Sequence, residues 1–262
     1  MNPSRVPTYR LVVEYDGSAF HGLQYQPELR TVAGSLEAAL ARLFHQIVKI
    51  TAAGRTDAGV HATGQVVSFT AERAFPIERL ALALNDNLPR DLVVRESALA
   101  PDGFSARFGA LERVYEYLIL NRPFPSALWR ARAWHVPRSI DDARFAEAAA
   151  PLIGEHDFLT YCGEPPEHGG TVRELRSIAL VRRGDLLRVT VRGNAFLHRM
   201  VRVVVGTLVG CATGYREVAF ARTALEVRER GAAGPTAPAH GLYLAGVRYE
   251  GFDTYRPVDI AP

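Results

Sequence analysis

The segment from Gly54 to Ala62 combines residue types that could do chemistry with a spacing that would expose them. Glycines at 54 and 59 bracket a polar turn that carries the guanidinium of Arg55, the carboxylate of Asp57 and the imidazole of His61. Small residues at this density let a ligand approach the backbone closely. If the turn is extended, Arg55 and Asp57 point the same way, and the arginine charge favours an ionised carboxylate that can act as nucleophile or base. The alternative is a tight turn in which Asp57 accepts hydrogen bonds from backbone amides.

Other catalytic arrangements fit the chain poorly. No Gly-Lys-Ser/Thr run follows the segment, so it is not a phosphate-binding P-loop. No second carboxylate is paired with Asp57 in the sequence. His156, Cys162 and His168 lack the spacing of zinc ligands, and a nucleophilic role for Cys162 fits no better. Among catalytic arrangements, carboxylate chemistry at Asp57 therefore fits best, and the tight structural turn stays open beside it.

The first half of the chain contains the elements that must position this segment. Hydrophobic alternation and helical periodicity predict the order strand, helix, strand, strand, helix, strand. The elements are a strand at 9–15, a helix capped by Thr31 with Leu36, Leu40, Leu43 and Phe44 on one face, strands at 47–52 and 64–70, a helix entered at Pro76, and a strand at 92–97. The segment then lies on a loop between two strands, where a rigid sheet can hold it.

The second half repeats that order. Its predicted elements are a strand at 114–120, a helix at 141–152, a hairpin of strands at 176–182 and 186–192, helices at 195–211 and 217–230, a last strand at 242–249 and a long surface loop at 154–170. Each half fits the split βαβ arrangement. The predicted fold class is α+β, with two ferredoxin-like halves and antiparallel sheets. The predicted domains are residues 1–103, which carry the Asp57 loop, and residues 104–262.

Arginine dominates the charge of the chain. Of the 31 basic residues only Lys49 is a lysine, and the formal net charge is +3. Residues 105–138 have six arginines against two acids, and residues 182–202 have six against one. Arginine suits phosphate recognition, so these stretches indicate a nucleic-acid partner. A genome that encodes arginine in place of lysine would explain the overall excess, but not the clustering.

The chain has the features expected of a cytoplasmic protein. Residues 1–10 lack the apolar core of a secretory signal, and two cysteines are too few for a disulfide framework. The most apolar run, 195–211, is interrupted by Arg199 and Arg202. We therefore expect no membrane span, which needs roughly 20 mostly uncharged residues.

Six blocks of the chain, in this order, resemble the tRNA pseudouridine synthase A family. The central block is Gly-Arg-Thr-Asp-Ala-Gly-Val-His at residues 54–61, which is similar to the family signature. The other blocks lie at 14–17, 85–89, 104–117, 194–206 and 241–244. Any one block could arise by chance, but six in order extend the resemblance over most of the chain.

The resemblance implies an enzyme that isomerises uridine to pseudouridine at positions 38, 39 and 40 of the tRNA anticodon stem-loop, in an active-site cleft between the two halves. It implies no metal, nucleotide or redox cofactor. Asp57 matches the essential aspartate, Arg202 resembles the arginine that pairs with it, and Tyr115 matches the tyrosine that stacks on the target uracil and takes the C5 proton. Arg55 resembles the arginine that displaces the target base, which must leave the helix. Leu244 would pack beneath the uracil.

Several readings stay open at this level. Asp57 could attack the sugar, attack the base, or act as a base in a glycal route. Without the family match, Tyr115 and Leu244 would be core residues and Arg202 a helix-surface arginine. A non-catalytic RNA-binding protein of the same fold, a synthase acting on other RNA positions, and a hydrolase using Asp57 as base are the rival functions.

The resemblance also implies a homodimer in which each tRNA touches both subunits. The apolar run at 195–211 could form part of a buried face. Arg107 and Arg113, at the start of the first arginine stretch, would contact the tRNA. Since such binding depends on phosphate contacts, it should weaken steeply with salt.

Overall fold

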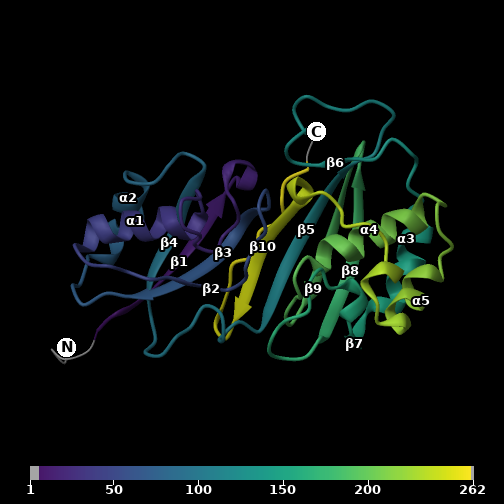
Figure 1. The fold of residues 1–262 in the computed structure, drawn as a ribbon. Coiled ribbons are helices and arrows are strands. Elements are labelled where there is room, and N and C mark those ends of the chain that lie inside the picture. The colour runs from purple at the N-terminus through teal and green to yellow at the C-terminus, as the bar shows by residue number, and fades with distance from the viewer. Residues whose placement is uncertain (1–5, 261–262) are drawn as a thin grey trace. The chain divides into compact units, whose positions relative to one another are not determined.

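Figure 1 shows the fold as a ribbon. The computed structural model describes residues 6–260, and its internal contacts separate it into two units. The first unit contains the residues up to Leu111 together with Leu244–Arg256, and the second contains Glu112–Tyr243 and the residues from Pro257 onward. Most of the last long strand therefore groups with the N-terminal unit, although it lies near the other end of the sequence.

The first unit is an antiparallel sheet with two helices. Its strands are β1 (Thr8–Tyr15), β2 (Thr51–Ala52), β3 (His61–Thr70), β4 (Leu92–Ala100), β10 (Leu242–Tyr249) and β11 (Phe252–Asp253), and its helices are α1 (Val32–Phe44) and α2 (Ile77–Asn85). The order across the sheet is β4–β1–β3–β10, with β2 also paired to β3 and β11 to β10. Because β3 lies antiparallel between β1 and β2, the predicted split βαβ arrangement is confirmed.

Local signals explain how α1 covers this sheet. The Thr31 side chain accepts a hydrogen bond from the Gly34 N–H at 3.1 Å, which satisfies a free donor at the start of the helix. The predicted apolar face is buried apart from Leu43, which is half-buried. The ring of Phe44 meets Tyr9 of β1 edge-on, with centroids 5.5 Å apart. The helix therefore packs on the sheet through its predicted face.

The predicted strand at 47–52 is wrong over most of its length, since only Thr51–Ala52 pairs with β3. The Ile50 N–H donates to the Glu37 side chain of α1 at 3.2 Å, and the same carboxylate binds Lys49 at 2.8 Å. Ile47 is 86% exposed. The ladder with β3 therefore begins only at Thr51, because a helix side chain takes the Ile50 N–H, although Val48 in the same stretch is buried.

The second unit is a mostly antiparallel sheet with three helices among its described residues. Its strands are β5 (Glu112–Leu120), β6 (Trp134–His135), β7 (Gly154–Asp157), β8 (Val172–Arg183) and β9 (Leu186–Gly193), and its helices are α3 (Asp142–Ala149), α4 (Met200–Ala212) and α5 (Phe220–Val227). The order is β5–β9–β8–β7, and β6 pairs with β5 in parallel. The predicted hairpin is confirmed: β8 and β9 pair as far as Arg183 and Leu186, across Gly184 with a φ of 56°.

The predicted helix at 195–211 begins later than expected, at Met200. Arg199 has a φ of 57°, a left-handed conformation that a helix interior excludes. The Asn194 Oδ1 accepts hydrogen bonds from the N–H groups of Ala195 at 2.6 Å and Glu174 at 3.1 Å. Apolar periodicity could not reveal this delay, because a side chain competes for the backbone donors.

The predicted surface loop at 154–170 is only partly irregular. It contains β7, which pairs with β8, and a 3-10 helix at Leu159–Tyr161. Tyr161 is fully buried and donates its hydroxyl to the Ala221 carbonyl at 2.7 Å. The start of this segment is therefore part of the second unit's core.

The helices predicted at 141–152 and 217–230 are shorter than expected. The first ends at Ala149 and continues as a 3-10 turn that contains Pro151, which has no N–H to donate. The second ends at Val227, because Arg228 takes a left-handed φ of 62°. The 3-10 helices are η1 (Gly17–Ala19), η2 (Ala150–Leu152), η3 (Leu159–Tyr161), η4 (Arg230–Ala232) and η5 (Ala239–Gly241). Over residues 6–260, no helix is long and apolar enough to cross a membrane.

Candidate active site

The loop between β2 and β3 carries the predicted catalytic segment. The Val60 N–H donates to the Asp57 carbonyl at 3.1 Å, and Gly59 has a φ of 78°. A glycine with positive φ at the third position is typical of a type II turn. Arg55 is exposed and Asp57 is half-buried. The loop therefore presents a guanidinium and a carboxylate two residues apart, as the sequence predicts.

Side chains from two strands fix the start of this loop from beneath. The Gln65 side chain of β3 donates to the Gly54 carbonyl at 2.7 Å and accepts from the Gly54 N–H at 3.4 Å. The Tyr15 hydroxyl of β1 lies 2.9 Å from the Thr56 hydroxyl in a buried hydrogen bond. Burial raises the pKa of Tyr15 to about 12. The residues before and after Arg55 are thus held by the Gln65 and Tyr15 side chains, which carry no charge near pH 7.

The segment after β1 braces the other side of the loop. The Leu23 N–H donates to the Thr56 carbonyl at 3.0 Å, and the Gly59 N–H donates to the Phe20 carbonyl at 3.3 Å. The Gly17 N–H donates to Nδ1 of His61 at 3.1 Å. His61 is 3% exposed, so its imidazole supports the loop from inside.

Gly22 lets this brace approach the catalytic segment closely. Its φ is 88°, in the region that favours glycine. A Cβ at this position would lie 2.8 Å from the Thr56 carbonyl oxygen and 3.3 Å from the carbonyl carbon of Asp57. No larger residue fits without displacing the backbone that carries Asp57.

Two further predicted residues belong to the first unit. Leu244 of β10 is fully buried. Arg107 is exposed, and its guanidinium carbon lies 5.3 Å from the ring centroid of Phe108, which is 82% exposed. The neighbouring Ala106 is tied to the sheet, because its N–H donates to Ser68 at 3.0 Å. The sheet thus fixes the backbone from which Arg107 extends.

Tyr115 lies on β5 in the second unit, opposite Val191 of β9. It is 7% exposed, and its ring meets Phe196 edge-on with centroids 5.0 Å apart. Edge-to-face packing of this kind holds an aromatic ring in one orientation. Phe196 lies in the turn before α4, where the sequence predicted the start of that helix. This turn therefore supplies a packing partner of Tyr115.

Arg202 lies in the first turn of α4 and is anchored through its backbone and its side chain. Its Nε donates to the Ala237 carbonyl at 2.8 Å, and its own carbonyl accepts from the Ala237 N–H at 3.0 Å. Burial raises the pKa of Tyr117, and the charge of Arg202 partly opposes that rise. Burial also lowers the pKa of His240, and the same arginine charge lowers it further. The guanidinium of Arg202 therefore lies close enough to Tyr117 and His240 for its charge to act on both.

Arg113 lies two residues before Tyr115 on β5. Its Nη1 donates to the Asn194 carbonyl at 2.7 Å. Asn194 begins the turn that carries Phe196, so Arg113 helps to hold the packing partner of Tyr115. The observed contact gives Arg113 a role in positioning this turn.

The two cysteines are buried within the second unit. The Cys162 Sγ donates to the Glu164 carbonyl at 2.9 Å, and burial raises the pKa of its thiol. A thiol with a raised pKa is a poor nucleophile. Within residues 6–260, no three His, Cys, Asp or Glu side chains gather in a metal-binding arrangement.

The predicted residues fall into two groups. Arg55 and Asp57 share one loop of the first unit, while Tyr115, Arg113 and Arg202 lie on β5 and α4 of the second. The residues that support them were not predicted as site residues from the sequence: Tyr15, Gly22, Gln65 and Phe196. Their sequence signals were ordinary: aromatic or polar positions in strands and turns, and a glycine whose φ no pattern disclosed.

Comparison with known proteins gives one consistent result. A family model described as tRNA pseudouridine synthase matches residues 11–108 and 148–250. tRNA pseudouridine synthase A of Caulobacter sp. (strain K31) is 43% identical over 247 residues, which cover 94% of this chain and 99% of that protein. The protein of the same name from Halalkalibacterium halodurans is 42% identical over 233 residues, covering 88% and 89%. That of Anaplasma marginale (strain St. Maries) is 44% identical over 245 residues, covering 92% and 99%.

Proposed function

Because the chain belongs to the tRNA pseudouridine synthase family and isomerises uridine in tRNA, we propose that Asp57 is its essential catalytic carboxylate. The α+β fold is the pseudouridine synthase fold predicted from the sequence. We further propose that the targets are uridines 38, 39 and 40 of the anticodon stem-loop, and that no cofactor takes part. The resemblance of residues 54–61 to the family signature supports the assignment of Asp57.

The observation that carries this proposal is the bracing of the Asp57 loop. A partly buried hydrogen bond from Gln65 holds the Gly54 carbonyl, and a buried one with Tyr15 holds the Thr56 hydroxyl. A turn closes over residues 57–60. A half-buried carboxylate on a backbone fixed on both sides is held in one geometry while remaining open to a ligand. Catalytic groups need such preorganisation, since misplacement by about 1 Å can cost 100-fold in rate.

The chemistry balances without a co-substrate. The bond between N1 of uracil and C1′ of ribose breaks, and a bond between C5 and C1′ forms. The proton lost from C5 is matched by the proton that N1 gains, and no electrons are transferred to or from another molecule. A carboxylate and a proton acceptor therefore suffice, whether Asp57 attacks the sugar, attacks the base or removes a proton on a glycal route.

The remaining residues have complementary roles in this proposal. Arg202 has the role that the family resemblance implies, as the arginine that pairs with the catalytic aspartate, and Arg55 occupies the space that the flipped base leaves. Tyr115 stacks on the uracil and accepts the C5 proton, with Leu244 beneath the base. Its edge-on contact with Phe196 would fix the plane on which a base can stack.

The wider assembly is also a proposal. We propose a cytoplasmic homodimer in which each tRNA touches both subunits, with Arg107 and Arg113 contributing to tRNA binding. Recognition would depend on shape and phosphate contacts, because three adjacent positions of different sequence context must be accepted. Sedimentation of the free protein and of its tRNA complex would test the stoichiometry.

The decisive experiment is tritium release from a tRNA transcript labelled at C5 of uridine, with wild type and Asp57→Asn. C5 loses its hydrogen only if it becomes the glycosidic carbon. We expect release by the wild type, no release by Asp57→Asn, and nearly equal tRNA binding by both. Loss of binding together with activity would make Asp57 structural, and mapping of pseudouridine in the product tests positions 38, 39 and 40.

A further inference from the structure

The connection between β5 and β6 is an arginine-rich loop in the second unit. Residues 121–138 contain four arginines and no aspartate or glutamate. The loop, defined here as residues 122–133, leaves the sheet at the end of β5 and returns at β6, which pairs with β5 itself. No proposed catalytic residue lies in it, and its charge is so far unexplained.

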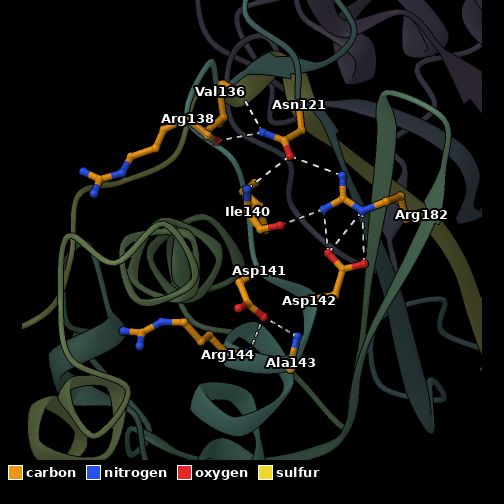
Figure 2. A network of polar contacts seen from close by, with 9 residues as sticks. All are labelled: Asn121, Val136, Arg138, Ile140, Asp141, Asp142, Ala143, Arg144 and Arg182. Atoms are coloured by element: carbon orange, nitrogen blue, oxygen red, sulfur yellow. Dashed lines mark hydrogen bonds and ion pairs between the residues drawn. The ribbon is translucent and has the colours of Figure 1, made fainter.

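A polar network clamps the base of this loop (Figure 2). The Asn121 Nδ2 donates to the carbonyl of Val136 at 2.9 Å and to that of Arg138 at 2.8 Å, which ties the residue before the loop to the residues after it. The Asn121 Oδ1 accepts from Arg182 at 3.2 Å. Arg182 in turn binds the Asp142 carboxylate at 2.6 Å. The network is anchored on β8 and on the first turn of α3, so the base of the loop is fixed.

The loop is braced internally as well. The Arg122 Nε donates to the Phe124 carbonyl at 2.9 Å, and its Nη2 donates to the Pro125 carbonyl at 3.3 Å. The Ser126 hydroxyl accepts from the N–H of Trp129 at 3.3 Å. Trp129 packs against the core cluster that contains Ala133. These contacts order the loop without burying its tip.

The ordered loop exposes large apolar side chains, and exposed arginines lie within it and just after it. Phe124 is 79% exposed and Leu128 is 87% exposed. Arg130 and Arg138 are exposed, and neither forms an ion pair with any described residue. Figure 2 shows the Arg138 side chain directed away from the network that holds its carbonyl. Exposed apolar groups on a fixed loop mark interaction sites.

We propose that the 122–133 loop, together with Arg138, is a tRNA-binding surface separate from the catalytic residues. Arg130 and Arg138 bind phosphates, and Phe124 packs on an unpaired base or an exposed base pair of the tRNA. Arg122 is already paired with Asp185 at 3.3 Å, but residues 121–138 themselves contain no acid, and the exposed Arg130 and Arg138 favour a polyanion over a second protein, whose surface would carry both signs of charge. This inference takes one element from the proposed function, namely that the ligand is tRNA.

The test is equilibrium binding of unmodified tRNA across a range of KCl concentrations. Arg130→Gln and Arg138→Gln each remove one phosphate contact, so each should reduce the slope of log affinity against log salt by about 0.7 to 0.9. Arg222→Gln is the matched control, because the Arg222 side chain is 72% exposed in the same unit but already pairs with Glu226. Its slope should equal that of the wild type.

A second variant tests the apolar part of the surface. Phe124→Ser combined with Leu128→Ser should weaken tRNA binding by about fivefold or more with an unchanged salt slope, because stacking is not a charge contact. Urea unfolding midpoints equal to the wild type show that each variant is folded. Binding is measured without turnover, so a wild type that binds tRNA but forms no pseudouridine refutes the proposed function and leaves this test intact.

Two outcomes would overturn the inference. Salt slopes for Arg130→Gln and Arg138→Gln equal to that of Arg222→Gln would show that these arginines contact no phosphate. A change in sedimentation of the Phe124→Ser, Leu128→Ser variant, with tRNA affinity unaltered, would assign the surface to contact between two copies of this chain.

Discussion

Gly22 offers a direct test of the idea that the brace after β1 positions Asp57. An alanine there must adopt the φ of 88°, and its Cβ would lie 2.8 Å from the Thr56 carbonyl oxygen. Ordinary van der Waals contact begins near 3.4 Å, so the loop or the brace must move by about 0.6 Å. Both partners are backbone atoms, which cannot turn aside as a side chain can.

Gly103 provides a matched control in the same unit. It has a φ of 75°, and a Cβ added to it would meet nothing within 4 Å. Both alanine variants therefore suffer the left-handed backbone strain of about 1–2 kcal/mol. Only Gly22→Ala also forces a Cβ against neighbouring backbone atoms, and such overpacking costs about a further 1–3 kcal/mol.

The assay is urea unfolding together with kcat for tritium release from C5-labelled tRNA. We expect Gly103→Ala to lose about 1–2 kcal/mol of stability and to keep its kcat within roughly twofold. We expect Gly22→Ala to be less stable still and to lose about 100-fold in kcat, since it displaces Asp57. Equal kcat for the two variants at matched folded fractions would refute the reasoning, because the brace would then not control Asp57.

Three further predictions follow from other contacts. Burial raises the pKa of Tyr15 from 10.0 to about 12, so the folded state keeps a proton that the unfolded chain loses above pH 10. The free energy of unfolding should therefore be unaffected by Tyr15 below pH 10 and fall as the pH rises to 12. In urea titrations, Tyr15→Phe should remove about 2–3 kcal/mol of this fall in stability at high pH. Tyr115→Phe should keep tRNA affinity but lose most of its tritium release, because stacking survives and the hydroxyl does not; full activity would exclude Tyr115 as the proton acceptor. Glu112 is 5% exposed and binds one arginine of β8 and one of β9, each at 3.0 Å. Glu112→Gln should cost about 2 kcal/mol of stability, which is less than for a fully buried pair because both arginines are about one-third exposed. Glu226→Gln, at an exposed helix pair, should cost less than about 0.5 kcal/mol.

Features that depend on neighbours in the sequence could be predicted. The Asp57 segment, the cap at Thr31 and the hairpin around Gly184 each depend on a few adjacent residues, and the structure has all three where expected. The last long strand matches the predicted range of 242–249. In these cases, side-chain alternation, capping chemistry and turn conformation act within a few residues.

Features that depend on partners far apart in the sequence could not be predicted. The strand predicted at 47–52 is reduced to Thr51–Ala52, where Glu37 takes the neighbouring Ile50 N–H. The helix predicted at 195–211 begins only at Met200, after a turn in which Asn194 bonds to Glu174. Neither competitor changes the hydrophobic pattern from which those elements were predicted. A polar side chain that captures a backbone donor is visible only once the chain has folded.

The candidate site shows the same division. Residue types at Arg55 and Asp57 suggested carboxylate chemistry from the sequence, and the resemblance of residues 54–61 and 104–117 to the family added the roles of Asp57 and Tyr115. Their positioning depends on Tyr15 and Gln65 beneath the loop and Gly22 beside it in the first unit, and on Phe196 against Tyr115 in the second; packing within each unit brings these residues there. Chemical identity belongs to single residues, whereas rigidity requires contacts between segments far apart in the chain, and only the tertiary structure can bring those together.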